Sequence, residues 1–553
     1  MTDAATPLLS HRQILTIIAG LVVGMFLAAL DMNIVATSIR VIADDLNGLT
    51  LQAWATTAYL VTSTLTTPLY GKLSDLYGRR PVFLFAIGLF LAGSLTCAFA
   101  GSMYQLAVFR AIQGLGGGGL FSLALTILSD IVAPRDRPRY QGYFTAMFAA
   151  SSVLGPLAGG LLAGQESILG IAGWRWVFLV NLPIGLVALV IVARVLNIPH
   201  TRRSRRVDWP GALALALGLV PLLVVAEQGR QWGWGSAASV GCFGIGAVGL
   251  VLFVLNERRY GEHALLPLEF FRNRTFGLGT AASMVIGVAM FGSTAALPLY
   301  LQIAKGASPT EAGLLTLPMV FGLICMSLTA GRIISRTGRL HRWPLLGVTL
   351  MIAGLGLLAA VDAHTSFRWV AVFMALFGMG LGASTQPIGL AVQSAMPVTS
   401  LGVATSSVTF FRQVGGTLGT AVFLSILFGT VSGKITEAFR ATAGSPDLAA
   451  ALADPSVRAD PVDRPILDAV ASGTPGSVSL DDTSFLNHLD PRLAQPFLDG
   501  FAASMSLTFA TGAAVLVLAW TLVLLMPEVP LRAKSALELR RDAEHPHPAD
   551  SVP

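Results

Sequence analysis

Three charged residues lie inside long apolar stretches of this sequence. Asp31 follows the apolar run Ile14–Leu30, and Arg110 and Arg412 each stand among aliphatic and aromatic residues. An ionisable group in such a stretch marks a pathway or a binding site by default, because an unpaired charge is costly in an apolar medium. A carboxyl group in this setting can take up and release protons, so Asp31 predicts proton coupling or cation binding, with structural hydrogen bonding as the alternative. Arg412 could pair with Asp31 or attract an anionic group of a ligand.

Two glycine-containing segments have the composition of moving parts. In the segment 71–80 the glycines permit a tight turn, and Asp75 can pair with a basic group or accept from a helix N-terminus. In the segment 155–160 a proline opens the helical hydrogen-bond ladder, which suits a helix that bends between two states. A charged turn and ordinary packing are the alternatives. The candidate gate residues are Gly71, Asp75, Gly78, Arg79, Arg80, Gly155, Pro156, Gly159 and Gly160.

Other chemistry finds little support in the sequence. We find no nucleophile and base suited to hydrolysis, so no catalytic residue is predicted and the chain is not expected to be an enzyme. None of the eight histidines lies within an apolar stretch, so no metal site is expected. The run Gly116–Gly119 lacks the Gly-Lys-Ser/Thr ending of a nucleotide loop, and it predicts close helix packing instead. Polar side chains that could line a cavity are Asn33, Gln113, Tyr300, Gln302 and Gln386, although an interfacial aromatic belt explains Tyr300 nearly as well.

The elements that position these residues are membrane-spanning helices. Of the 553 residues, 54% are hydrophobic and only 12% are charged, whereas soluble domains carry about 25% charged residues. The apolar residues form runs of roughly 18 to 25, the length that crosses a hydrocarbon core about 30 Å thick. The fourteen predicted spans are 14–40, 51–71, 82–101, 104–129, 141–164, 175–197, 209–227, 236–256, 275–299, 309–331, 343–362, 367–391, 400–430 and 497–526.

The distribution of basic residues predicts the orientation of these spans. With the N-terminus in the cytoplasm, the inner loops and tails hold most of the arginines, as the positive-inside rule requires. The short outer loops hold only Arg40, Arg175, Arg230, Lys305 and Arg368. Both termini are therefore expected in the cytoplasm. The scarcity of lysine beside abundant arginine, alanine and glycine is typical of a GC-rich bacterial genome, and we expect a multi-pass protein of the bacterial cytoplasmic (inner) membrane.

An internal repeat predicts two similar halves. The segment 108–118 recurs at 372–382, the loop 71–79 recurs at 331–339, and Gly155–Gly159 aligns with Gly415–Gly419. These echoes keep one order and nearly one offset, which indicates two parallel six-helix bundles separated by two inserted helices. In the second copy of the loop Ser335 replaces Asp75, so only the first copy carries the carboxylate. The expected fold class is an all-α membrane protein.

At this point the chain resembles the major facilitator superfamily, and within it the fourteen-helix drug:proton antiporters of the EmrB/QacA type. The motifs that carry the resemblance are the loop 71–80, Arg110 with Gln113 to Gly116, Gly155–Gly160, Leu30–Thr37, and Phe410–Gly419. Trp174–Gly185 and Leu297–Gln302 fit the same branch. The departures are Asn33 for a usual threonine, Arg40 for a usual proline, and Ser151 for a frequent glycine.

The resemblance implies a division of labour among these residues. It assigns Arg110 to proton coupling, with a structural ion pair as the alternative. It also implies a latch in the loop 71–80, which is expected on one side only because Ser335 replaces Asp75 in the second copy. The segment 155–160 resembles the motif that marks antiporters, which favours export over uptake. The expected divisions are 1–13 (cytoplasmic N-terminus), 14–200 (first bundle), 201–274 (linker with two helices), 275–526 (second bundle, including the extracytoplasmic loop 431–496) and 527–553 (cytoplasmic tail).

Together these features predict a proton-coupled exporter of lipophilic or amphipathic small molecules that works by alternating access, with Asp31, Arg110 and Arg412 in proton coupling. No cofactor is expected beyond the proton motive force. The expected partners are the substrate, protons and the lipid bilayer, without nucleic acid, and the chain is expected to be a monomer. The polar loop 431–496 is either a partly disordered connector or a cap or partner-docking element. The alternative function is a dedicated exporter of a lipid, a cell-envelope precursor or a natural product, with an extracytoplasmic partner.

Overall fold

The computed structural model describes residues 10–48, 51–196, 207–443, 445–460, 463–472, 489–531, 535 and 537–539. Its α-helices are α1 (His11–Asp45), α2 (Gln52–Tyr77), α3 (Arg79–Ala98), α4 (Met103–Ile131), α5 (Arg137–Ala163), α6 (Trp176–Leu179), α7 (Asn181–Val195), α8 (Trp209–Trp232), α9 (Ala237–Tyr260), α10 (Arg274–Ile303), α11 (Pro309–Leu315), α12 (Leu317–Thr337), α13 (Arg342–Leu358), α14 (Phe367–Ala395), α15 (Leu401–Thr442), α16 (Pro446–Ala453), α17 (Pro455–Ala459), α18 (Arg464–Ala471) and α19 (Pro491–Leu524). The shorter elements are 3₁₀ turns at Gly173–Arg175, Gly261–His263, Leu268–Arg272 and Val398–Ser400, and an antiparallel hairpin of β1 (Ser167–Ile168) and β2 (Ile171–Ala172).

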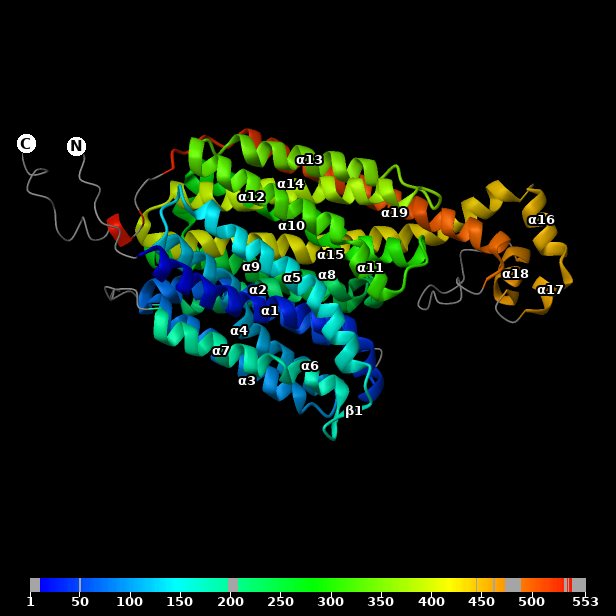
Figure 1. Ribbon diagram of the computed structural model, residues 1–553, viewed down its shortest axis with the longest axis horizontal. Helices are drawn as coiled ribbons and strands as arrows, with labels where there is room; N and C mark the ends of the chain where they lie inside the picture. Colours follow the sequence, from blue (N-terminus) through cyan, green and yellow to red (C-terminus); the bar gives the residue numbers. More distant parts are fainter. Residues whose placement is uncertain are drawn as a thin grey trace, which may run out of the picture.

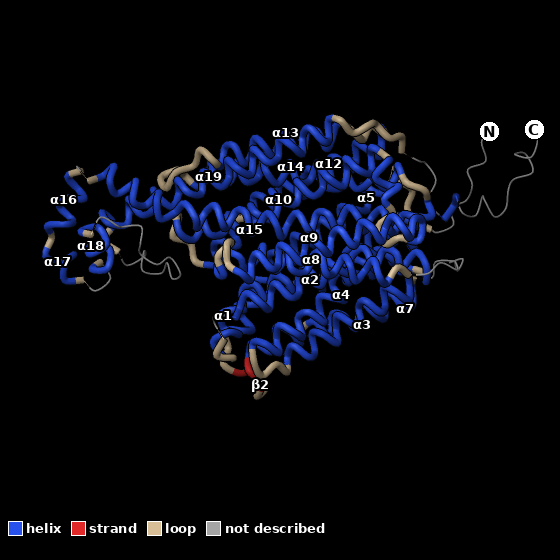
Figure 2. Tube along the Cα trace, turned by 180° about the vertical axis from the view of Figure 1, so that it is seen from behind, coloured by secondary structure: helices blue, strands red, loops and turns tan. Residues whose placement is uncertain are grey.

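The long helices lie side by side in one elongated bundle (Figure 1). α1 begins and α19 ends at the same end of this bundle, which we call the terminal face. The small helices α16, α17 and α18 project from the opposite end, beyond the ends of α15 and α19 (Figures 1 and 2). Counted from α1 through α19, the chain therefore crosses the bundle an even number of times.

Each of the fourteen predicted spans coincides with a helix or a pair of short helices. Within the described residues, twelve helices are long and apolar enough to cross a membrane. α2 and α13 fall outside this set, because α2 is rich in threonine and serine and α13 has only 17 residues. A tilted bundle still accommodates both, since 17 residues is the lower end of the spanning range. An all-α membrane fold with fourteen spans fits the whole pattern.

Two predicted spans are interrupted where proline follows. The sixth span divides into α6 and α7 at Val180, where Pro183 has no amide hydrogen to donate to the carbonyl of Leu179. The tenth divides into α11 and α12 at Thr316, and Pro318 stands in the first turn of the second piece, the position that proline favours. The first of these breaks falls beside the candidate site described below.

The polar helix α2 is held by the glycine-rich face of α4. Thr62, Thr66 and Thr67 donate to the carbonyls of Ala111, Leu115 and Gly118 on α4 at 2.9 to 3.3 Å. A Cβ atom added to Gly118 would stand 2.2 Å from the carbonyl oxygen of Ser63. The run Gly116–Gly119 therefore allows close helix packing, and this prediction is confirmed.

The apolar core has separate centres in the two halves of the chain. One large cluster is built from residues of α10 to α19, with Phe377, Phe423 and Phe509 fully buried. Two clusters are built mainly from α1 to α7, around Phe83, Phe90 and Phe178. Helices α8 and α9 pack on each other, and α8 also contacts α2 and α15. The seam between the two halves is formed mainly by α2 against α15 and by α5 against α12.

The segment 431–496 is more helical than the prolines at 455, 461, 465 and 475 suggest. α15 continues to Thr442 and α19 begins at Pro491, because Val431, Ile435 and Phe439 are buried in the same core as Phe497. The rings of Phe439 and Phe497 meet edge to face, with centroids 6.5 Å apart. Prolines 455 and 465 stand in the first turns of α17 and α18, where a missing amide hydrogen costs nothing. The residues 473–488 lie outside the described part.

Candidate functional site

Asp31 and Arg110 form a buried ion pair between α1 and α4. Arg110 Nη1 lies 2.6 Å from Asp31 Oδ2, and the two side chains are 2% and 0% exposed. Gln113, one turn further along α4, donates from Nε2 to Asp31 Oδ1 at 2.8 Å. The Gln113 carbonyl oxygen accepts a 2.7 Å hydrogen bond from Arg110 Nη1. Three of the predicted site residues thus form one polar cluster, which we call the Asp31 cluster.

Residues that the sequence did not single out complete the Asp31 cluster. Asn181, the first residue of α7, donates from Nδ2 to Asp31 Oδ1 at 2.7 Å and to Ser94 Oγ at 3.0 Å. The guanidinium carbon of Arg110 stands 4.3 Å from the centre of the Tyr59 ring, a cation–π contact. Asn181 stands in the stretch Trp174–Gly185, so family likeness could have marked it, but no local pattern linked it to Asp31, which lies 150 residues earlier.

The Asp31 cluster is compensated in charge but not fully satisfied in hydrogen bonds. Arg110 Nε, Asn181 Oδ1 and Tyr59 Oη are buried and have no hydrogen-bond partner in the described structure. Such groups are rare in native proteins, and each has its explanation in strain, in function or in a bound water or ion. A buried carboxylate with an arginine and two amides around it can hold its charge without water, and a proton can neutralise it at the expense of the ion pair.

Arg412 lies apart from this cluster. It is half-buried on α15, and within the described residues it has no ion-pair or hydrogen-bond partner. Pairing of Arg412 with Asp31, one of two alternatives for this residue, is absent: Asp31 pairs with Arg110, and α15 packs mainly on helices other than α1. The next residue, Gln413, accepts a 3.0 Å hydrogen bond from Thr67 on α2 across the seam between the halves.

The remaining candidate cavity residues occupy different settings. Asn33 is half-buried, and its amide donates to the carbonyl of Ala29 within α1 at 2.8 Å. Gln302 is half-buried near the end of α10. Tyr300 is only 1% exposed, and its hydroxyl donates to the Asp362 carbonyl at 3.1 Å. In this conformation the Tyr300 ring belongs to the apolar core and anchors a loop, and its place in a substrate cavity stays a prediction.

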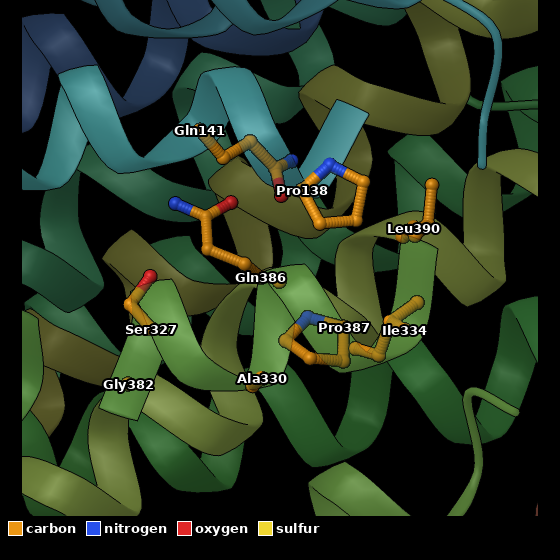
Figure 3. A pocket seen from close by; sticks show the side chains of 10 residues that line it. Pro138, Gln141, Ser327, Ala330, Ile334, Gly382, Gln386, Pro387 and Leu390 are labelled. Carbon is orange, nitrogen blue, oxygen red and sulfur yellow. The ribbon is translucent and has the colours of Figure 1, made fainter. Parts of the chain in front are cut away.

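Gln386 lies at the seam between the halves (Figure 3). It lines a small cavity of about 10 Å³ together with Gln141 and Ser327, between α5, α12 and α14. Figure 3 shows the side chains of Gln141 and Gln386 next to each other among the residues that line this cavity. A space of this size holds about one water molecule, so the seam is closed here.

The segment 71–80 forms an ion network at the terminal face. Arg79 bonds Asp130 Oδ2 from Nε at 2.6 Å and lies 2.6 Å from Asp75 Oδ1 through Nη1. Asp75 Oδ2 accepts a 3.2 Å hydrogen bond from the backbone of Val403, in the first turn of α15, which satisfies a free amide at a helix N-terminus. Asp75 thus connects the two halves.

The other predicted residues of this segment support that contact. A Cβ on Gly71 would stand 2.2 Å from Ser406 Oγ on α15, so only glycine permits this approach. Gly78 has φ of 94°, a conformation that favours glycine. Arg80 is exposed and donates to the carbonyl of Ala193 on α7, so it binds within its own half.

A second contact between the halves lies at the terminal face. Arg135 donates to the carbonyls of Ser335 and Arg336 at the end of α12, at 2.9 and 3.1 Å. Arg137 donates to Gln393 Oε1 on α14 at 2.8 Å, and Gln393 in turn donates to Thr405. Contacts between the halves therefore exist beside the second copy of the loop as well, where helix-end carbonyls and an amide accept in place of the carboxylate that Ser335 lacks; a latch on one side only stays a prediction.

The segment 155–160 packs α5 closely on α1. A Cβ on Gly155 would stand 2.3 Å from Asn33 Cβ, and a Cβ on Gly159 would stand 2.2 Å from Thr37 Oγ1. Pro156 lies within the helix. Gly160 faces the other way, where a Cβ would meet nothing within 4 Å. Among the described residues, no group of three histidine, cysteine, aspartate or glutamate side chains could hold a metal ion.

The chain is similar to known proteins in sequence and in fold. The family model described as Major Facilitator Superfamily matches residues 21–420. The chain is 34% identical to the multidrug transporter protein MdtP of Bacillus subtilis, over 77% of each chain. It is 31% identical to multidrug resistance protein 3 of Bacillus subtilis, over 95% of this chain and 97% of that one. The solved structure of the proton:xylose symporter XylE bound to 6-bromo-6-deoxy-D-glucose matches with a TM-score of 0.58 at 13% identity, covering 96% of this chain and 99% of that chain, a likeness of fold alone.

Proposed function

Because this chain belongs to the Major Facilitator Superfamily, we propose that it is a proton-coupled antiporter that exports lipophilic or amphipathic small molecules of the multidrug type. It is a membrane transporter, not an enzyme, and its relatives include named multidrug transporters. The observation that carries proton coupling is the Asp31 cluster, in which a fully buried carboxylate shares its charge with a single arginine.

The coupling step follows from the chemistry of that pair. With Asp31 ionised, Arg110 is held at 2.6 Å; with Asp31 protonated, the ion pair is lost and Arg110 becomes an uncompensated buried cation. Such a cation is expensive in an apolar setting, so the protonated state favours a conformation that hydrates or repositions Arg110. Substrate binding and proton binding then drive the two opposite conformational changes of one alternating-access cycle.

The two contacts at the terminal face provide the gate in this proposal. Asp75 with Val403, and Arg137 with Gln393, hold the halves together where we place the cytoplasm. The proposed division of the chain is into the bundles 14–200 and 275–526 and the linker 201–274. Both tails are proposed to lie in the cytoplasm of a bacterium. No cofactor enters this cycle, and the driving force is the proton gradient. We assign Arg412 to coupling as a fixed positive charge between the halves.

The test is dye uptake into inside-out vesicles that carry the native chain and an imposed pH gradient. Each pH unit corresponds to about 1.4 kcal/mol per proton, or roughly tenfold accumulation. Native vesicles should accumulate dye, and Asp31→Asn should abolish accumulation while leaving exchange without a gradient intact. Asp44→Asn, an exposed carboxylate on the same helix, is the matched control. Gradient-driven accumulation by Asp31→Asn would contradict the proposed coupling.

A dedicated exporter of a lipid, envelope precursor or natural product is the second candidate. The helices α16–α18 motivate it, since they form a folded extension on the face opposite the termini. Arg492 at the start of α19 ties this extension to the bundle through Asp454 and Asp490, at 3.0 and 2.8 Å. If deleting α16–α18 abolished an envelope phenotype but spared dye export in vesicles, an extracytoplasmic partner would become the better explanation.

A further inference from the structure

We infer that Asn181 is a positioning residue whose hydrogen bonds change when Asp31 is protonated. Through this change, the protonation of Asp31 alters the hydrogen bonding at the junction between α6 and α7. The inference deepens the proposed function, because it rests on Asp31 as the coupling acid. Asn181 is 0% exposed and stands at the break in the sixth span. Its amide is the contact of that span with the carboxylate.

The orientation of the Asn181 amide follows from the charge on Asp31. An ionised carboxylate only accepts hydrogen bonds, so the Asn181 nitrogen must face Asp31, as it does at 2.7 Å. Asp31 Oδ1 already accepts from Gln113 at 2.8 Å. With Arg110 on Oδ2, both oxygens of the carboxylate are engaged in the ionised state.

A proton on Asp31 changes what its neighbours must offer. A protonated carboxyl group needs an acceptor for its O–H. Asn181 Oδ1 is buried and has no hydrogen-bond partner in the described structure, and rotation of the amide by about half a turn brings this oxygen to Asp31. The Gln113 carbonyl oxygen, by contrast, already accepts from Arg110 at 2.7 Å. Asn181 is therefore the unoccupied acceptor beside the acid.

The same rotation reaches the backbone of the sixth span. Ser94 on α3 accepts from Asn181 Nδ2 at 3.0 Å and donates to the Phe178 carbonyl in α6 at 2.9 Å. When the Asn181 oxygen turns toward Ser94 as well, the Ser94 hydroxyl can donate to it and release the Phe178 carbonyl. Protonation of Asp31 thereby changes a hydrogen bond at the break between α6 and α7. Asn181 lies at this break, two residues before Pro183.

No other ionisable group needs to titrate for this response. The groups that face Asp31 and Asn181 are Arg110 from α4, Cys97 from α3 and Tyr59 from α2. Arginine stays charged at all physiological pH values, and a thiol and a phenol buried in an apolar site stay neutral. Asp31 is thus the group in this cluster whose charge changes, and Asn181 the one whose hydrogen bonding must follow.

The test is a pH titration of the Asp31 carboxyl stretch by infrared difference spectroscopy on purified full-length protein, with Asp31→Asn to identify the band. Asn181→Leu removes both the donor to the ionised form and the acceptor for the protonated form; because a hydrogen bond to the charged carboxylate is the stronger of the two, the titration midpoint should move to higher pH by about one unit. Asn181→Gln keeps the amide and should restore much of the native midpoint. Ser94→Ala should produce a smaller shift in the same direction, because it frees the Asn181 amide without removing it.

The controls separate this inference from general damage and from the proposed function. Thr126→Ala, which removes a buried hydroxyl that bonds only within α4, should leave the midpoint in place. A native midpoint in Asn181→Leu would overturn the inference. If the midpoint moves as expected but Asp31→Asn still accumulates dye against the gradient, the role of Asn181 at Asp31 stands and proton coupling through Asp31 fails. The pH dependence of dye uptake should shift with the infrared midpoint if both hold.

Discussion

The Asp31 carboxylate accepts hydrogen bonds from side chains on two other helices, Arg110 and Gln113 on α4 and Asn181 on α7. A buried pair of this kind contributes little net stability, yet losing one partner costs about 3 to 5 kcal/mol because the other charge is left uncompensated. The large free-energy change therefore occurs when the carboxyl group is neutralised, because this creates a mismatch in which the Arg110 charge is left without a counter-charge. That mismatch is what an exporter can use to change conformation.

Arg412 offers the opposite case, a cation with no partner to lose. Arg412→Gln removes a half-buried charge without breaking an ion pair, so we expect the thermal unfolding temperature in detergent to stay level or rise. We also expect the ratio of cationic to anionic substrate export to increase severalfold, since the fixed positive charge repels cations.

Arg412→Lys is the matched control, because it keeps the charge and should keep the native substrate ratio. A large fall in the unfolding temperature of Arg412→Gln would show that the guanidinium has a structural partner. An unchanged ratio of cationic to anionic export would remove Arg412 from substrate selection.

Individual residue types could be predicted from the sequence, but their partners could not. A charge in an apolar run is visible in one dimension, and Asp31, Arg110 and Arg412 were all found this way. Whether Asp31 meets Arg110 or Arg412 depends on how helices pack, and nothing local decides it. Asn181 is an ordinary polar residue before a proline, and only the packing of α7 on α1 brings it to Asp31.

At the scale of elements, adjacent glycines in α5 have opposite surroundings. Gly159 faces Thr37 and the Ile34 carbonyl on α1, whereas Gly160 faces open space. Gly159→Val should force α5 away from α1 and lower the unfolding temperature by several degrees or prevent folding, as overpacking does. Gly160→Val should be neutral within about 0.5 kcal/mol.

The measurement is thermal unfolding in detergent, with size-exclusion chromatography to follow folding. The two variants add the same side chain one position apart, so each serves as the control for the other. Equal stability of both would mean that α5 and α1 are not in close contact.

Helix boundaries followed from the sequence where apolar runs were long, and failed where tertiary packing extended them. α15 continues past its apolar run because one face, including Ile435 and Phe439, packs on α19. The hairpin β1–β2 spans only a few residues around Gly170, which has φ of 77°, and its strands are too short to show alternation. The threonine-rich α2 was expected as a span, and its hydroxyls turn out to bond α4.

At the scale of the whole molecule, the two contacts at the terminal face should act together. Asp75→Asn with Arg137→Ala weakens both, and each lost hydrogen bond to a charged group corresponds to about 1.5 to 3 kcal/mol. We expect the seam to open, so that a cysteine at Gln386 in a background without Cys97, Cys242 and Cys325 reacts with a water-soluble maleimide at least tenfold faster.

The matched control is Arg339→Ala, an exposed arginine at the same face whose side chain has no partner in the described structure. It should leave the maleimide rate unchanged. Each single variant should give an intermediate rate, and equal rates for native protein and double variant would mean that other contacts close this seam.

The extension of α15 has a mechanical consequence. Its 42 residues form a rod of about 63 Å, roughly twice the thickness of the hydrocarbon core. Because α19 packs against this long helix through buried apolar side chains, the two helices form a stiff pair. The helices α16–α18 lie at the far end of this pair. Small tilts of the second bundle are magnified there, so a fluorophore on α16 would display the transport cycle from outside the membrane.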